Sequence, residues 1–178
     1  MTDVRAQGHP MRTDRTEVVP VTVEVAEALL ESDAAFRERF GPDVATGYLA
    51  FPEALPATLD ALRCGMPPQW FSYLVIDPVE DLVVGMGGFT GPPVDGAVEI
   101  GYSVAPAHRG RGHATAAARL WLDLAAREGV SLVRAHTLAE EGPSTTVLRR
   151  LGFERVAEID DAEDGPVWRW ERAPGPTT

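Results

Sequence analysis

The chain has 178 residues, with 27 acidic against 16 basic side chains and a formal net charge of -11 at pH 7. A protein that binds duplex nucleic acid usually presents a basic surface, so this balance argues against a nucleic-acid partner. The hydrophobic fraction of 44% supports a packed core and excludes global disorder.

The sequence also argues against a membrane protein and a metal site. It contains no apolar run of about 18 residues, so we expect no transmembrane helix. The polar first residues lack the apolar region of a signal peptide, which favours a cytoplasmic protein with no membrane partner. Cys64 is the single cysteine, and the four histidines lack zinc-ligand spacing, so no metal is expected.

Glycine and proline punctuation, together with apolar periodicity, predicts the order of the elements. Residues 1–14 read as a disordered tail, and residues 173–178 as a second tail. Between them we expect strands at 16–21, 70–76, 82–89, 97–104, 131–137, 153–159 and 167–172, and helices from Thr22, at 33–40, 58–63, 112–128 and 143–151. An acidic turn at 160–165 joins the last two strands. Three strands run consecutively before the first crossover, which predicts a mixed α/β fold rather than a doubly wound one.

The most informative stretch is the glycine- and arginine-rich turn at 108–115, between a strand and a long helix. Its glycines let a ligand approach the backbone, and the helix start offers unpaired N–H groups, which together suit a phosphate or pyrophosphate. A P-loop is excluded because the turn has no lysine. A dinucleotide fingerprint is disfavoured because no acidic residue follows at the tip of the next strand.

Three segments resemble the GCN5-related N-acetyltransferase (GNAT) family. Arg109-x-x-Gly112-x-Ala114 matches the family's Arg/Gln-x-x-Gly-x-Gly/Ala signature in the same strand-turn-helix setting. The segment 99–106 (EIGYSVAP) resembles the fourth strand of the family, and 144–153 (STTVLRRLGF) resembles the segment that ends in Leu-Gly-Phe. The chain is most similar in character to the ribosomal-protein alpha-amino acetyltransferase branch. The resemblance runs from about Trp70 to Arg172 and is poor before Trp70.

The resemblance implies a fold and a co-substrate. The fold would be a central, mostly antiparallel mixed sheet with helices on both faces and a splay between its fourth and fifth strands. One domain would span residues 15–172, with a variable acceptor-side part at 15–69 and a CoA-binding core at 70–172. Acetyl-CoA would lie in the splay, with its pantetheine arm against Val104 and its pyrophosphate held by the turn. The residues implied in holding the pyrophosphate are Arg109, Gly110, Arg111, Gly112, His113 and Ala114, with the hydroxyl of Thr115 added.

The implied reaction is the attack of an amine on the thioester, which needs a base for the amine and an acid for the departing thiolate. Strand alternation places Glu99 on a face with Ala97, Gly101 and Ser103, and it matches the glutamate that many family members use as the base. A solvent-facing residue or a structural hydrogen bond is the other interpretation of Glu99.

The acid is less clear from the resemblance. Leu148 replaces the tyrosine that many members use, so Ser144 is the candidate, although it could simply help to cap a helix. Tyr102 and Tyr73 are the other candidate acids. Glu141 stands where the family often has an asparagine that contacts the pantetheine.

We therefore predict an N-acetyltransferase that moves an acetyl group from acetyl-CoA to a primary amine by direct attack in a ternary complex. The acceptor would be a small-molecule amine or a peptide N-terminus, drawn in by residues 21–70 and the acidic turn. Family members often form homodimers, so a homodimer is an expected assembly. The alternative is a non-catalytic module that binds or senses acyl-CoA, which Leu148 and Glu141 favour because both depart from common catalytic choices.

Overall fold

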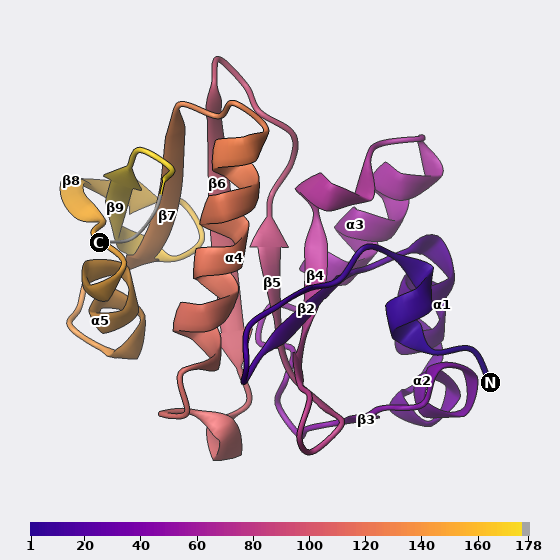
Figure 1. Cartoon of the computed structure of the whole chain (residues 1–178). Helices are drawn as coiled ribbons and strands as arrows, with labels where there is room; N and C mark the ends of the chain where they lie inside the picture. The colour runs from indigo at the N-terminus through magenta and orange to yellow at the C-terminus, as the bar shows by residue number, and fades with distance from the viewer. Residues whose placement is uncertain (176–178) are drawn as a thin grey trace.

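The computed structural model describes residues 1–175 and shows a mixed α/β architecture built on one continuous sheet (Figure 1). The strands are β1 (Met11–Arg12), β2 (Glu17–Pro20), β3 (Asp43–Val44), β4 (Ser72–Asp77), β5 (Leu82–Phe89), β6 (Ala97–Val104), β7 (Leu132–Leu138), β8 (Glu154–Asp161) and β9 (Gly165–Arg172). The helices are α1 (Val23–Glu31), α2 (Asp33–Phe40), α3 (Ala54–Arg63), α4 (His113–Arg127) and α5 (Pro143–Arg150). Single 3₁₀ turns occupy Val4–Gln7, Pro68–Trp70 and Pro106–His108.

The strands follow the order β1-β2-β4-β5-β6-β7-β9-β8, and β3 pairs with the start of β5. Two pairs are parallel, β6 with β7 and β3 with β5, and the remaining pairs are antiparallel. The helix α4 makes the crossover between β6 and β7, which is the connection that a parallel pair requires. The expected mostly antiparallel mixed sheet with helices on both faces is confirmed.

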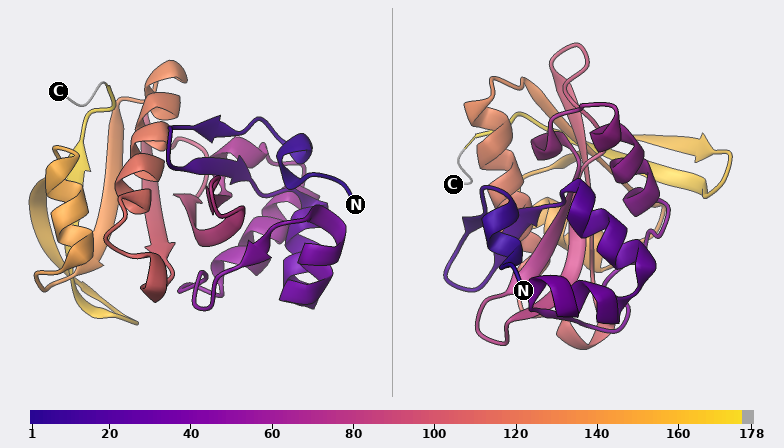
Figure 2. Two further views of the ribbon diagram at one scale, coloured as in Figure 1. Left: turned by 60° about the horizontal axis from the view of Figure 1, so that its bottom comes forward. Right: turned by 90° about the vertical axis from the view of Figure 1, so that its right-hand side faces the viewer.

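Side-chain alternation along β4 separates two cores on opposite faces of the sheet. Tyr73 and Val75 belong to the core beneath α4 and α5, whereas Leu74 and Ile76 belong to the core beneath α1, α2 and α3. Figure 2 shows the two groups of helices in further orientations. The splitting follows directly from a strand whose six residues are all buried.

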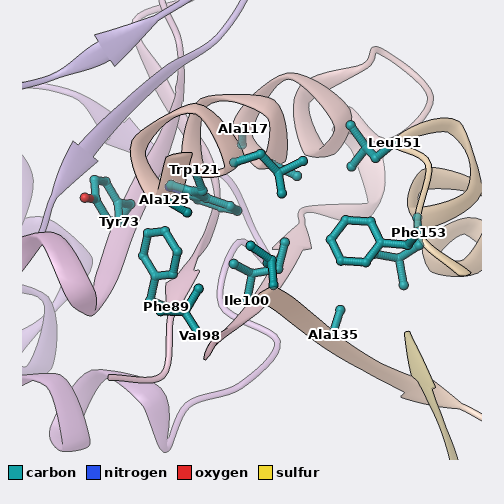
Figure 3. Close-up of a cluster of buried hydrophobic side chains, with 14 of the residues drawn as sticks. Tyr73, Phe89, Val98, Ile100, Ala117, Trp121, Ala125, Ala135, Leu151 and Phe153 are labelled. Atoms are coloured by element: carbon teal, nitrogen blue, oxygen red, sulfur yellow. The ribbon is translucent and has the colours of Figure 1, made fainter. Parts of the chain in front are cut away.

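The core under α4 is centred on Trp121, which is fully buried between the helix and the sheet (Figure 3). A Cβ atom added at Gly87 would lie 2.5 Å from the Trp121 ring, so only glycine lets the helix pack this closely on β5. The inward stripe of α4 is His113, Ala117, Ala118, Trp121, Leu122 and Ala125. Ala114 is half-buried and faces a cavity described below.

The first fourteen residues are ordered, so the prediction of a disordered tail there is wrong. Val4 is fully buried in the α1–α3 core, and β1 pairs with β2. The Nε atom of Arg5 donates to Glu17 at 2.6 Å and its guanidinium also contacts Asp81. Residues 173–175 carry no helix or strand, and the rest of the predicted second tail, 176–178, lies outside the described residues.

Two further boundaries differ from the sequence prediction. Helix α3 begins at Ala54 rather than at residue 58, because Pro56 falls in its first turn, where the missing N–H is not needed. The acidic turn is also shorter than predicted. Asp160 and Asp161 belong to β8, where they pair with Pro166 and Gly165 of β9, and the turn itself spans residues 162–164.

Candidate active site

The two parallel strands β6 and β7 separate part of the way along their length. They pair from Ala97 with Leu132 to Glu99 with Arg134, and beyond that register β6 continues to Val104 without β7 beside it. Tyr102 lies past the separation, and its hydroxyl donates to the carbonyl oxygen of Ser144 at 3.1 Å. Burial raises the pKa of Tyr102, so this hydroxyl keeps its proton as a donor. The predicted splay between the fourth and fifth long strands is confirmed.

A cavity of about 630 Å³ lies at this splay, which is large enough for part of an extended ligand. It is bounded by the end of β6, the turn before α4, the first turn of α4, the end of β7, the start of α5 and the loop before α3. The residues that line it are Ala50, Phe51, Tyr102, Ser103, Val104, His108, Arg109, Gly110, Gly112, His113, Ala114, Thr115, Leu138, Glu140, Pro143, Ser144, Thr146, Val147 and Arg150.

The turn before α4 is shaped to receive an anion. Gly112 is the N-cap residue in the left-handed conformation, with φ +87°, and no side chain caps the helix. A Cβ atom at Gly112 would have no protein atom within 4 Å, so the space in front of the turn is open. The first N–H groups of α4 and the positive end of its dipole therefore face the cavity without a competing carboxylate.

The side chain of Arg109 stabilises this turn by a hydrogen bond to the preceding strand. Its Nε atom donates to the carbonyl oxygen of Val104 at 3.1 Å, which ties the turn to the end of β6. Val104, Arg109, Gly110, Gly112, His113, Ala114 and Thr115 all line the cavity, so the structure brings these predicted residues together.

The side chain of His113 anchors the turn to the sheet. His113 is 3% exposed, its Nδ1 atom lies 2.9 Å from the Thr16 hydroxyl, and its Nε2 atom lies 3.5 Å from Asp77. Burial lowers the pKa of His113, and this effect outweighs the attraction of Asp77 for the charged form. The imidazole of His113 therefore packs beneath the turn and is not available to a ligand. The backbone N–H of His113 is the group of this residue that can face the cavity.

Two of the predicted cofactor residues lie outside the cavity and pair with other side chains. Arg111 donates to Glu80, in the turn between β4 and β5, at 2.7 Å. Glu141 forms two hydrogen bonds with Arg149, at 2.5 and 2.6 Å, and these bonds lower the pKa of Glu141 to about 2. Neither pair was visible in the sequence because each depends on the fold bringing two segments together.

The start of α5 presents Ser144 to the cavity. The capping hydrogen bonds of this helix involve Thr145, whose hydroxyl accepts from the N–H of Gly142 and is also within reach of the Gly142 carbonyl. The alternative interpretation of Ser144 as a cap is therefore not needed. Leu148, one turn later, is fully buried in the core under α4 and α5 and does not line the cavity.

Glu99 lies at the last paired register of β6 and β7, beside the cavity rather than among its lining residues. Its Oε1 atom lies 2.8 Å from Nδ1 of His136 on β7, a partner that the sequence analysis missed. Ser103 extends the same face of β6 to the cavity, where its hydroxyl donates to the Tyr48 carbonyl and accepts from the Ala50 N–H. These bonds fix the loop before α3 against the face that carries Glu99.

The acidic turn does not reach the cavity lining. Asp161 instead accepts hydrogen bonds from the N–H groups of Glu163 and Asp164, which lower its pKa. In residues 1–175, no group of three or more His, Cys, Asp or Glu side chains could hold a metal ion. No helix in that part of the chain is both long enough and apolar enough to cross a membrane.

Comparisons with known proteins agree with this geometry. Residues 15–154 match the family model described as an acetyltransferase (GNAT) domain. The chain belongs to the GNAT acetyltransferase family, and it is therefore an acetyl-CoA-dependent N-acyltransferase. A comparison with curated protein sequences finds no significant match.

Solved structures with the same fold include ribosomal-protein acetyltransferases. The ribosomal-protein-S5-alanine acetyltransferase from Vibrio fischeri has a TM-score of 0.65 at 14% identity, covering 95% of this chain and 98% of that one. RimJ from Mycobacterium smegmatis, solved with CoA-disulfide, has a TM-score of 0.63 at 20% identity, covering 89% and 81%. A protein from Bordetella pertussis that is assigned to the GNAT family has a TM-score of 0.64 at 26% identity, covering 93% and 99%.

Proposed function

We propose that this protein transfers an acetyl group from acetyl-CoA to a primary amine by direct attack in a ternary complex. The observation that carries the proposal is the uncapped start of α4 behind an open glycine turn, at the mouth of a cavity that continues to Ser144. A pyrophosphate at this helix start gains N–H donors and the helix dipole without displacing any protein group. Val104 and Ser144 then lie along the route from that turn into the splay.

The CoA-binding groups follow from the same arrangement. The backbone N–H groups of residues 109–114 hold the pyrophosphate, and the Thr115 hydroxyl adds a donor. Backbone groups of Val104, which face the cavity beyond the last β6–β7 pair, bind the pantetheine arm. The side chains of Arg111 and Glu141 stabilise the loop and the helix around the site by pairing with Glu80 and Arg149, rather than by contacting the ligand.

The chemistry needs one base and one acid. Glu99 takes a proton from the amine, directly or through a water molecule, as the amine nitrogen attacks the thioester carbonyl. The C–S bond then breaks, and the thiolate receives a proton for which the Ser144 hydroxyl is the candidate donor. The hydroxyl of Tyr102 holds Ser144 in place by donating to the carbonyl oxygen of Ser144.

The acceptor is a small-molecule amine or a peptide N-terminus. Two solved structures with this fold, a ribosomal-protein-S5-alanine acetyltransferase and a ribosomal L7/L12 alpha-N-protein acetyltransferase, favour a peptide N-terminus by their names. The segment 15–69 forms the acceptor side, because its residues Ala50 and Phe51 border the cavity. Phe51 and Leu138, each 53% exposed, come from distant segments and give this cavity an apolar border.

A single set of assays tests the proposal. Calorimetry should detect acetyl-CoA and CoA binding, and a screen of amines and peptide N-termini should release free CoA thiol. Glu99→Gln and Ser144→Ala should retain acetyl-CoA binding and lose turnover. A wild-type protein that ignores both CoA ligands contradicts the proposal.

The alternative expected from the sequence is a non-catalytic acyl-CoA-binding module, because Leu148 and Glu141 depart from common catalytic choices. Membership of an acetyltransferase family argues against this alternative. The burial of Leu148 and the pairing of Glu141 with Arg149 also give both side chains structural roles outside the cavity. Binding of acetyl-CoA without turnover on any amine of the screen would favour the module over the proposed enzyme.

A further inference from the structure

The side chain of His136 connects Glu99 to a third residue. His136 lies on β7, two positions past the last residue that pairs with β6, and Nδ1 is 2.8 Å from Oε1 of Glu99. Arg169 is its register partner on β9, and the Nε atom of Arg169 lies 3.3 Å from Nε2 of His136. Three strands thus supply one chain of hydrogen bonds, all on the sheet face that bears Glu99.

The chemistry of the three groups fixes the direction of these bonds. A guanidinium has only donors, so Nε2 of His136 accepts from Arg169. The imidazole proton then sits on Nδ1, where it donates to Oε1 of Glu99. One carboxylate oxygen is held in place and the other, Oε2, is left to accept a proton.

We propose that His136 and Arg169 are positioning residues for Glu99, which hold its carboxylate so that Oε2 faces the attacking amine or its bridging water. The inference rests on the proposed function, in which Glu99 is the base. The proton from the amine ends on Oε2, because Nδ1 of His136 already carries a proton and the lone pair of Nε2 is occupied by Arg169. Neither residue exchanges a proton in the reaction.

The alternative is an ordinary surface contact that only strengthens the pairing of the strands. The chain offers a matched control for it, since Arg134 and Glu171 form a pair at 2.6 Å two positions away along β7 and β9 on the same face, and Glu171 lies one strand farther from Glu99 than Arg134 does. Both pairs are half-buried and both join neighbouring strands. A purely structural role predicts the same consequence for the loss of either pair.

The test compares His136→Ala, His136→Asn, Arg169→Leu and the control Glu171→Leu. The Asn side chain places an amide donor near the position of Nδ1, so it can restore the bond to Glu99. At saturating acetyl-CoA, we expect kcat to fall about tenfold or more in His136→Ala and Arg169→Leu, which is part of the effect of a general base. We expect His136→Asn and Glu171→Leu to stay within about threefold of wild type, and the affinity for acetyl-CoA to be unchanged throughout.

A second measurement does not depend on turnover. The ¹⁵N spectrum of the wild-type protein should show His136 protonated at Nδ1, and Arg169→Leu should shift the Nε2 resonance because the bond to that nitrogen is lost, while Nδ1 keeps its proton toward Glu99. Protonation at Nε2 in the wild type, an unchanged kcat in His136→Ala, or equal losses in the Ala and Asn variants would overturn the inference. Wild-type protein that acetylates no amine would instead overturn the proposed function, and with it the catalytic purpose of His136.

Discussion

The open space in front of Gly112 allows a substitution that separates backbone strain from ligand contact. Gly112→Asp places a carboxylate at the start of α4, and Gly112→Ala places a methyl group there. Gly129, with φ +73°, follows the other end of the same helix and has equally open space, so Gly129→Asp and Gly129→Ala are matched controls. Gly129 does not line the cavity.

The structure sets the expected magnitudes. An alanine in the left-handed conformation costs about 1–2 kcal/mol at either glycine, because the added Cβ crowds its own backbone and nothing else. Two like charges about 4 Å apart repel by about 1 kcal/mol in water and by about 4 kcal/mol near a protein surface. A carboxylate at Gly112 beside a bound pyrophosphate should therefore raise the Kd for CoA by about fivefold at the lower figure and by nearly a thousandfold at the higher one.

Thermal unfolding and calorimetry with CoA measure the two effects. We expect the two alanine variants to lose similar stability, and only the variants of Gly112 to lose CoA affinity, with Asp worse than Ala. Wild-type affinity in Gly112→Asp, or an equal loss of affinity in Gly129→Asp, would refute the assignment of this turn to the pyrophosphate.

Three further predictions concern His113 beneath the turn, Phe51 at the border of the cavity, and Leu148 in the core. The lowered pKa of His113 keeps it neutral in the folded state, so below about pH 6.5 the unfolded chain binds a proton that the folded chain does not, and the free energy of unfolding should fall by up to about 1.4 kcal/mol per pH unit. Urea unfolding at pH 7 and pH 5 should show this loss in wild type and a smaller one in His113→Asn. An equal change in the free energy of unfolding between the two pH values in both proteins would contradict the prediction. Phe51→Ala should raise the KM for the amine about five- to tenfold by removing apolar contact, with acetyl-CoA affinity retained, whereas Val94→Ala, also exposed but outside the cavity, should change neither. Leu148→Ala should lower the free energy of unfolding by about 2–5 kcal/mol in urea titrations, and an unchanged stability with weaker CoA binding would show that Leu148 faces the ligand after all.

Local signals in the sequence were sufficient for most of the sheet and for the glycine turn before α4. Strand alternation predicted that Glu99 shares a face with Ala97, Gly101 and Ser103, and the buried Val98 and Ile100 indeed lie on the other face of β6. The glycines at 110 and 112, followed by a helical pattern, marked the start of α4 because a positive φ and an uncapped helix are local properties.

The errors arise where a residue's environment depends on distant segments. The polar composition of segment 1–14 predicts a tail, but Val4 is buried in the core beneath α1, α2 and α3. Arg111 and Glu99 read as ligand or solvent contacts, but each meets a partner more than thirty residues away, at Glu80 and His136. Charge pairing across strands has no periodic signal, so a single sequence does not reveal it.

The hydrogen bond between Thr16 and His113 joins residues 97 positions apart. It connects the N-terminal segment to the turn proposed to bind CoA, so we expect the affinity for CoA to depend on that segment as well. If CoA binds best when the turn is held by the Thr16–His113 contact, then bound CoA must stabilise that contact by the same free energy by which the contact improves CoA binding. Acetyl-CoA should therefore slow proteolysis at residues 1–16, which lie outside the cavity lining, and a fusion or truncation there would act as a remote inhibitor.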